Sequence, residues 1–310
     1  MISLALRALV VCLLVAFGHC QQVLQPFTSV VVCANSDVGF QPSSDSSYSM
    51  VVQGNQELFD TVEAVVEDGV LYVQSPKAAQ SDNGDVVAII SAPKDAIKDL
   101  TVSGNGDVYL VDGFTSPSFQ IVNSGNGDVE ADLAVSDTIT VRVEDNGDVE
   151  LVGSFGSLDL TLSGNGDFDI FGLTGNANVK LEGNGDAFIG GSAQTVISGS
   201  QTGNGELEYS GGGTCTVQSE FAEDTCQRED DEEPDFISLP RPSSSESVRN
   251  SVAICAKGGA APSSPATSTP ASTSPGDITT DDTSSSPSSS GYRTLPFVAV
   301  SLIMMAQLFI

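Results

Sequence analysis

One hexapeptide with an acidic residue at its fifth position recurs seven times between residues 81 and 209. Its copies read SDNGDV at residue 81, SGNGDV at 103 and at 124, EDNGDV at 144, SGNGDF at 163, EGNGDA at 182 and TGNGEL at 202. The intervals between copies are 22, 21, 20, 19, 19 and 20 residues. A fixed period in this range indicates a repeat architecture in which each copy is one structural unit.

The acidic position of this motif is where cation chemistry would occur. If the repeats stack as coils about 4.8 Å apart, neighbouring carboxylates would repel each other by roughly 1 kcal/mol in water. Ca²⁺ would relieve this repulsion, because it prefers several carboxylate and carbonyl oxygens as ligands. The candidate calcium ladder consists of Asp85, Asp107, Asp128, Asp148, Asp167, Asp186 and Glu206.

A mechanical explanation of the motif needs no ligand. Gly and Asn tolerate positive φ, so they would let the chain reverse tightly, and the following Asp can accept hydrogen bonds from the turn backbone. The motif also differs from the nonapeptide of calcium-binding repeat proteins, whose period is about half as long. We therefore expect no required cofactor, with Ca²⁺ as the alternative.

Catalytic chemistry has few suitable residues in this sequence. The only histidine, His19, lies in a predicted signal peptide, so the mature chain would lack the imidazole of Ser-His-Asp or Cys-His catalysis. The carboxylates repeat uniformly, whereas a glycoside hydrolase needs one distinctive pair. We predict that the protein is not an enzyme, and a polysaccharide-acting β-helix enzyme is the less favoured alternative.

The charge balance restricts the partners. The chain of 310 residues has 11 Lys and Arg against 41 Asp and Glu, which gives a formal net charge of −30. Such a charge repels phosphate backbones and anionic lipid, so we expect no nucleic acid partner and membrane attachment only through a lipid anchor. A cell-surface or matrix protein or a glycan is the expected partner.

Short runs in which apolar and polar residues alternate flank each motif and would position it. Val149–Leu151 follows one copy, for example, and Ile139–Val143 and Leu158–Leu162 precede two others. Alternation with a period of two predicts half-buried strands, so the fold class is all-β. We favour coils of about 20 residues that pair in parallel. An antiparallel β-meander or barrel is the alternative, because Asn-Gly is also a preferred hairpin turn.

Residues that alternate with the apolar positions would face outward. They form the candidate contact surface, unless they only keep the sheet soluble. These residues are Tyr109, Glu130, Thr140, Arg142, Asp159, Thr161, Asp169 and Lys180.

Both ends of the chain carry apolar runs with targeting features. Residues 1–20 have the pattern of a secretory signal peptide. Residues 295–310 are mainly apolar and follow small residues and a polar spacer, which is the order of a glycosylphosphatidylinositol (GPI) anchor signal. Ser284 is the expected attachment residue, with Ser288 or Gly291 as alternatives. We expect an anchored protein on the outer face of the plasma membrane or cell wall.

Composition divides the rest of the chain. The predicted parts are N-terminal strands at 21–80, the repeat domain at 81–217, an acidic linker with cysteines at 218–256, a Ser/Thr/Pro-rich and O-glycosylated stalk at 257–291, and the removed anchor signal at 292–310.

The segment before the repeats adds a family resemblance. It contains VVV at 30–32, VVQ at 51–53, DGVLYV at 68–73 and ISAP at 90–93, and then runs into the Gly-Asn-Gly-Asp repeats. This succession, over about residues 27–217, resembles the head GIN domain family of autotransporter adhesins. The resemblance implies a right-handed parallel β-helix-like solenoid, an adhesive or surface role, and no established catalytic residues. Two features depart from the family pattern. Asn stands between the glycines where Ser is usual, and the predicted anchor is of the eukaryotic type.

Four cysteines remain after removal of the signal peptide, which predicts two disulfides with three possible pairings. In the solenoid that the resemblance implies, a bridge from Cys33 to Cys215 would have to span the stack, which disulfide geometry forbids. The solenoid therefore implies Cys215 with Cys226 as a cap on the last coil. It also implies Cys33 with Cys255, because the 29 residues after Cys226 are long enough to fold back.

Together these features predict a non-enzymatic, GPI-anchored, adhesin-like or display protein at the cell surface. A structural component of a cell wall or coat is the alternative, which would associate with itself rather than with another cell or molecule.

Overall fold

The computed structural model describes residues 20–76, 79–81, 86–219, 226–229, 237–241, 248–250 and 255. All of them belong to the compact unit Met1–Ser263. Residues 1–19 of the predicted signal peptide, the predicted stalk and the candidate anchor residues Ser284, Ser288 and Gly291 lie outside the described residues. Asp85 lies outside them too.

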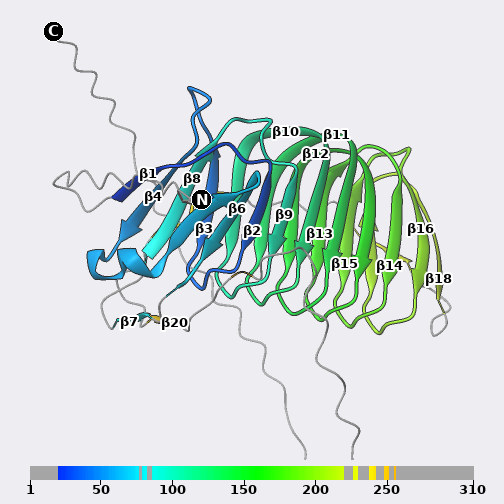
Figure 1. The fold of residues 1–310 in the computed structure, drawn as a ribbon. Helices are drawn as coiled ribbons and strands as arrows, with labels where there is room; N and C mark the ends of the chain where they lie inside the picture. The colour runs from blue at the N-terminus through cyan, green and yellow to red at the C-terminus, as the bar shows by residue number, and fades with distance from the viewer. Residues whose placement is uncertain are drawn as a thin grey trace, which may run out of the picture. The chain divides into compact units, whose positions relative to one another are not determined.

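The repeats form stacked coils with two long faces, and Figure 1 shows the strands side by side along the stack. Face A contains the strands that follow the motif. They are β3 (Val38–Pro42), β8 (Val86–Ala92), the first halves of β10 (Val108–Asn123), β11 (Val129–Val143) and β12 (Val149–Leu162), and then β13 (Phe168–Leu173), β15 (Ala187–Gly191), β17 (Leu207–Ser210) and β19 (Cys226–Arg228).

Face B contains the strands that precede the motif. They are β2 (Ser29–Val32), β6 (Val70–Gln74), β9 (Asp99–Val102), the second halves of β10, β11 and β12, and then β14 (Ala177–Leu181), β16 (Val196–Gln201) and β18 (Thr214–Ser219). The three long strands bend from one face to the other, so hydrogen bonds join both faces into one 18-stranded sheet.

Pairing within the repeats is parallel and in register. Val108 lies opposite Val129, Val129 opposite Val149, and the same position continues through Phe168 and Ala187. The predicted parallel solenoid with coils of about 20 residues is therefore confirmed, and the antiparallel meander or barrel is wrong for the repeats.

Antiparallel pairs occur at the N-terminal edge of the stack. There β1 (Cys20–Val23) pairs with β4 (Ser49–Gly54), β4 pairs with β8, and β5 (Glu63–Glu67) pairs with β6. A 3₁₀-helix, η1 (Gln56–Thr61), follows β4. The short strands β7 (Ala79–Ser81) and β20 (Val248–Asn250) form a separate antiparallel pair.

The first coils do not stack in chain order. Strand β2 lies between β6 and β9, and β3 lies between β8 and β10. The coil at 29–42 is thus inserted between the later coil at 70–92 and the coil that begins at residue 99. The chain must therefore pass over a whole coil between β8 and β9.

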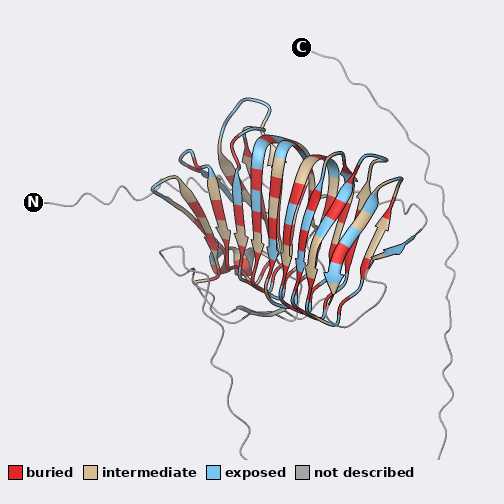
Figure 2. Ribbon diagram, turned by 90° about the vertical axis from the view of Figure 1, so that its right-hand side faces the viewer, coloured by how far each residue is buried: buried red, intermediate tan, exposed pale blue. Residues whose placement is uncertain are grey.

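The core lies between the two faces. Inward residues such as Val108, Leu110, Ile139 and Val141 are completely buried, while their neighbours along each strand are half-buried or exposed. Figure 2 shows these buried and accessible residues alternating along the strands. The period of two in the sequence therefore corresponds to an apolar interior and a polar exterior.

Within the described residues, no helix has the length and apolar character needed to cross a lipid bilayer.

Candidate functional site

The asparagines of the motif form a continuous side-chain ladder. Each side-chain amide nitrogen donates to the amide oxygen of the asparagine in the preceding coil, over 2.8 to 3.0 Å. The ladder runs through Asn35, Asn105, Asn126, Asn146, Asn165, Asn184 and Asn204. Each interior asparagine uses one donor and one acceptor in this way, so the ladder ties successive turns together.

The motif carboxylates form a second ladder beside the first. The Oδ1 atom of each aspartate accepts the backbone N–H of the acidic residue in the next coil, over 2.7 to 3.2 Å. This ladder runs through Asp37, Asp107, Asp128, Asp148, Asp167, Asp186 and Glu206. The aspartates therefore accept hydrogen bonds from turn backbone, as the mechanical explanation expects, but from the following coil rather than from their own turn.

The motif glycines serve a different purpose from the predicted one. The described glycines with positive φ are Gly54, Gly69, Gly113, Gly153, Gly172, Gly199 and Gly211, none of which is in a motif. No motif asparagine has a positive φ in the described copies either, so the prediction of positive φ is wrong for the six copies from residue 103 onward. A Cβ at Gly127 would lie 2.2 Å from the oxygen of Gly106, and one at Gly166 would lie 2.3 Å from that of Gly147. Glycine is needed because the backbones of neighbouring coils approach too closely for a side chain.

The first rung of both ladders comes from a segment that the repeat pattern did not identify. Asn35 and Asp37 occupy the positions of Asn105 and Asp107, although Ser36 stands where the other rungs have glycine. A Cβ at Gly106 would lie 2.3 Å from the backbone oxygen of Ser36, so the close approach that requires glycine in the later rungs begins at Gly106.

The copy at residue 81 has a different register. Ala88, and not Val86, lies opposite Val38, whereas in the following coils the residue directly after the motif aspartate takes this place. The strand after this copy is therefore shifted by two residues relative to the strands that follow the ladder aspartates from Asp37 onward.

The described residues contain no group of three or more His, Cys, Asp or Glu side chains arranged to hold a metal ion. The ladder aspartates from Asp37 to Asp186 each accept a backbone N–H, and Glu206 accepts the side-chain amide of Gln227, which partly compensates their charge. Calcium binding by the ladder stays a prediction.

The predicted contact residues all face outward, but they divide between the two faces. Tyr109, Glu130 and Asp169 lie on face A in successive coils, where Glu150 stands between the two acids. Burial raises the pKa of Tyr109, and the charges of Asp107, Asp37 and Glu130 raise it further. This outer row is therefore strongly acidic.

The remaining contact residues lie on face B. Thr140 and Asp159 are opposite each other, as are Arg142 and Thr161, and Lys180 continues the second row. Arg142 pairs with Glu144 and Lys180 with Glu182, over 2.5 and 2.8 Å. These exposed pairs contribute little stability but reduce the positive charge of the face.

Two disulfides lie near the two ends of the stack, and they are the two pairs named from the solenoid. Cys215 is joined to Cys226 at the last coil, and Cys33 is joined to Cys255 across a sequence separation of 222 residues. The Sγ atom of Cys255 is buried against the carbonyl oxygens of Val31 and Val73.

Part of the predicted linker lies on the solenoid. Strand β19 pairs with β17, and β20 pairs with β7. The side chains of Leu239 and Pro240 lie close over Gly39 on face A, where a Cβ would come within 2.7 and 2.9 Å of them. Those described parts of 218–256 thus belong to the folded unit, in contrast to a purely solvated linker.

Comparisons with known proteins agree with this architecture. Residues 26–213 match the family described as "Putative auto-transporter adhesin, head GIN domain". A solved "putative adhesin" from Bacteroides fragilis has a TM-score of 0.52 and 17% identity, and the match covers 68% of this chain and 95% of that one. At this identity the likeness shows a shared fold. No curated protein matches the sequence.

Two structures from Parabacteroides distasonis are also similar at lower TM-scores. A "putative adhesin" has a TM-score of 0.48 and 16% identity, with 68% of this chain and 96% of that one covered. A "putative lipid binding protein" has a TM-score of 0.42 and 15% identity, with the same coverage.

Proposed function

We propose that this chain, which belongs to the autotransporter adhesin head GIN domain family, is a non-enzymatic, adhesin-like protein of the cell surface. Its partner in this proposal is a cell-surface or matrix protein or a glycan, bound by the outer side chains of the solenoid. The family assignment supports a surface or extracellular location.

The observation that carries the proposal is a regular row of hydrogen-bonding side chains on face B, here named the polar row. Its members lie opposite one another on successive strands, and all but the half-buried Thr140 are exposed. They are Asp99, Gln120, Thr140, Asp159, Asn178, Ser198 and Thr216. A rigid row with about 4.8 Å between members offers many simultaneous contacts at little entropic cost.

Binding of the full chain to an array of matrix proteins and glycans tests this proposal. The double variant Thr140→Lys, Asn178→Lys places two long cations on the polar row and should weaken binding by about tenfold or more. The matched control Thr115→Lys, Asn176→Lys makes the same changes at exposed residues outside the polar row and should bind like the wild type. Equal binding by both double variants, or self-assembly in place of binding, would contradict the proposal.

Attachment to the surface is a separate part of the proposal. We infer a GPI anchor on Ser284, which the small residues, polar spacer and apolar segment at 295–310 support. Phosphatidylinositol-specific phospholipase C should release the protein from expressing cells. Retention in the membrane fraction after treatment would disprove the anchor without affecting the binding proposal.

A further inference from the structure

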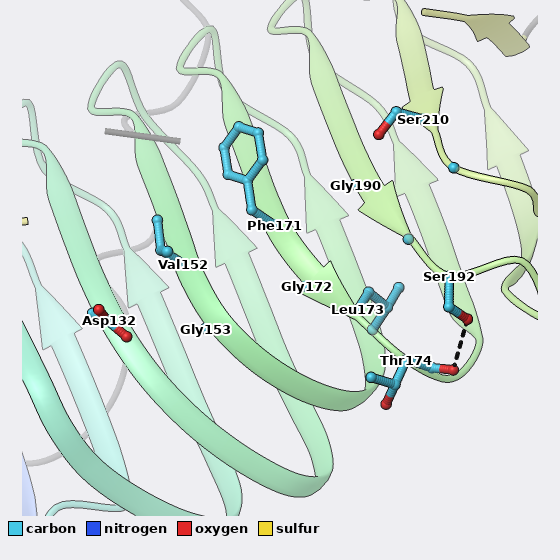
Figure 3. Close-up of a pocket in the computed structure, with 12 residues that line it drawn as sticks. Asp132, Val152, Gly153, Phe171, Gly172, Leu173, Thr174, Gly190, Ser192 and Ser210 are labelled. Carbon is cyan, nitrogen blue, oxygen red and sulfur yellow. Dashed lines mark hydrogen bonds between the residues drawn. The ribbon is translucent and has the colours of Figure 1, made fainter. Parts of the chain in front are cut away.

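A groove of about 670 Å³ crosses face A near the bend of the coils, here named the corner groove. Asp132, Val152, Phe171, Gly190 and Ser210 line it from five successive strands and lie opposite one another in register. The groove therefore runs along the stack, perpendicular to the strands. Figure 3 shows Asp132, Val152 and Phe171 on consecutive coils, and the hydrogen bond from the Ser192 hydroxyl to the backbone oxygen of Thr174.

Two obligatory glycines keep the groove open. Gly153 and Gly172 have φ values of 141° and 97°, which residues with a side chain rarely adopt. A Cβ at Gly153 would also lie 2.0 Å from the oxygen of Leu133, and one at Gly172 would lie 2.0 Å from that of Gly153. Because neither position can carry a side chain, the hollow is a fixed consequence of how the coils stack.

The groove has an apolar centre. Phe171 is half-buried, and its ring packs against the buried ring of Phe188, with 5.3 Å between the centroids. This contact orients the Phe171 ring, while the remaining side of the ring and the half-buried Val152 stay accessible to a ligand. An aromatic ring in such a place can pack against an aliphatic or cationic side chain.

The charge of the groove is negative at the end that holds Asp132, whereas Arg228 donates a hydrogen bond to the backbone oxygen of Gly211 at the other end. Asp132 lies at one end, where burial, followed by the charge of Asp112, raises the pKa of its carboxyl group. Glu130, Glu150 and Asp169 form a parallel acidic row two residues away on the same strands. The described residues that line the groove include no lysine or arginine. A cation beside Asp132 would offset this unfavourable burial of negative charge.

We propose that the corner groove binds an extended basic segment of a partner protein, with an Arg or Lys at Asp132 and an apolar side chain against Phe171. Charge complementarity favours this occupant over a glycan, because a neutral sugar would gain little from the acidic row and an anionic sugar would be repelled. The site is on face A and is independent of the polar row, so it goes beyond the proposed function.

Fluorescence anisotropy of a labelled peptide with the repeat Arg-Ser-Leu-Ser, titrated with the full oxidised chain, tests this site, because residues two apart in an extended chain face the same side. Binding should be saturable and should weaken as salt increases. A peptide with Glu in place of Arg, and one with Gly in place of Leu, should bind at least about tenfold more weakly, since each lacks one of the two contacts.

Two groove variants, two matched controls and one conservative variant separate this site from general charge attraction. Asp132→Asn and Phe171→Ser should each weaken peptide binding by about tenfold. Their matched controls, Asp68→Asn and Val23→Ser, should leave it unchanged, because both residues are exposed and neither lines the groove or belongs to the polar row. Phe171→Tyr retains the ring and should retain affinity, which guards against a loss caused only by misfolding.

Several results would overturn the inference. Equal losses in Asp132→Asn and Asp68→Asn would mean that the net charge of the chain attracts the peptide. Binding of a neutral oligosaccharide such as chitohexaose that depends on Phe171, without peptide binding, would assign the groove to a glycan instead. Failure of the peptide experiment while the array binding still depends on the polar row would leave the proposed function intact.

Discussion

The side-chain Oδ1 atom of Asp148 accepts the backbone N–H of Asp167 over 2.8 Å. The backbone N–H of Asp148 in turn donates to Asp128 over 2.9 Å. Each motif aspartate in the middle of the stack thus accepts from one neighbouring coil and donates to the other. The motif is therefore a device for joining coils, and its charge is secondary to this role.

The asparagine ladder should contribute measurably to stability. Asn165 donates to Asn146 and accepts from Asn184, so Asn165→Ala removes two hydrogen bonds. We expect a loss of about 1 kcal/mol in the free energy of unfolding, because the side chain is exposed and each bond contributes modestly. Urea denaturation of the oxidised protein measures this change.

Asn178→Ala provides the matched control for that experiment. Asn178 is exposed on face B, and its side chain makes a long bond of 3.4 Å to Asp159. We expect its loss to change stability by less than about 0.5 kcal/mol. Equal effects of both substitutions would mean that the two ladder hydrogen bonds contribute no more than the single long surface bond.

Close approach of the coils predicts a severe effect of Gly166→Ala. The added methyl group would meet the backbone oxygen and carbonyl carbon of Gly147 at 2.3 and 2.8 Å, and backbone cannot move aside. We expect a loss of roughly 4 kcal/mol or a failure to fold. At Gly69, where φ is 79° and nothing lies within 4 Å, alanine should cost only about 1 kcal/mol. Thermal melts that rank Gly69→Ala as the worse variant would refute the steric explanation.

These glycines also show what the sequence could not predict. The fixed period and the alternating runs depend on local order, so they predicted the parallel coils and the outward residues such as Thr140 and Lys180 correctly. The reason for glycine is a contact between Gly166 and Gly147 in different coils, which local turn preferences do not include. Turn chemistry alone therefore suggested positive φ, which is absent from the described motif residues.

The burial of Asp132 predicts a dependence of stability on pH. Burial and Asp112 raise the pKa of this carboxyl group above its ordinary value of 3.8. The folded state therefore favours the protonated form, and this contribution to stability is lost as the pH rises through the folded-state pKa. Asp132→Asn should raise the melting temperature at pH 7, and the gain over the wild type should disappear near pH 3.

The exposed Asp159 serves as the comparison in the pH experiment. Asp159→Asn removes the same charge from face B, where the side chain is exposed. A gain at pH 7 that is as large for Asp159→Asn as for Asp132→Asn would indicate general relief of charge repulsion. A gain for Asp132→Asn that persists unchanged at pH 3 would also argue against a raised pKa.

The two disulfides should differ in their contributions. The bond between Cys33 and Cys255 closes a separation of 222 residues, and that between Cys215 and Cys226 closes one of 11. On the loop-entropy account, replacing the first pair by alanine should cost about 5 kcal/mol and the second about 3 kcal/mol. Urea denaturation of the two double variants measures the difference. Non-reducing peptide mapping that links Cys33 to Cys215 would contradict the stack itself.

The order of the first coils is the other feature that sequence reasoning missed. The segment Asn35-Ser36-Asp37 lacks the motif glycine, so it did not register as a repeat, although it provides the first rung. The recognisable copy at residue 81 leads into a strand of shifted register. Packing between β2, β6 and β9 decides which coils lie next to each other. No local pattern in the sequence indicates this order.

Adhesion of cells that display the full chain tests the central claim most directly. A non-adherent host cell would carry the wild type, the polar-row variant Thr140→Lys, Asn178→Lys, or the control Thr115→Lys, Asn176→Lys. We predict that cells with the wild type and the control are retained under flow on a surface coated with matrix protein or glycan, and that cells with the polar-row variant are not. Retention of the polar-row variant at the level of the wild type, or no retention of the wild type on any coating, would contradict an adhesive face on this solenoid.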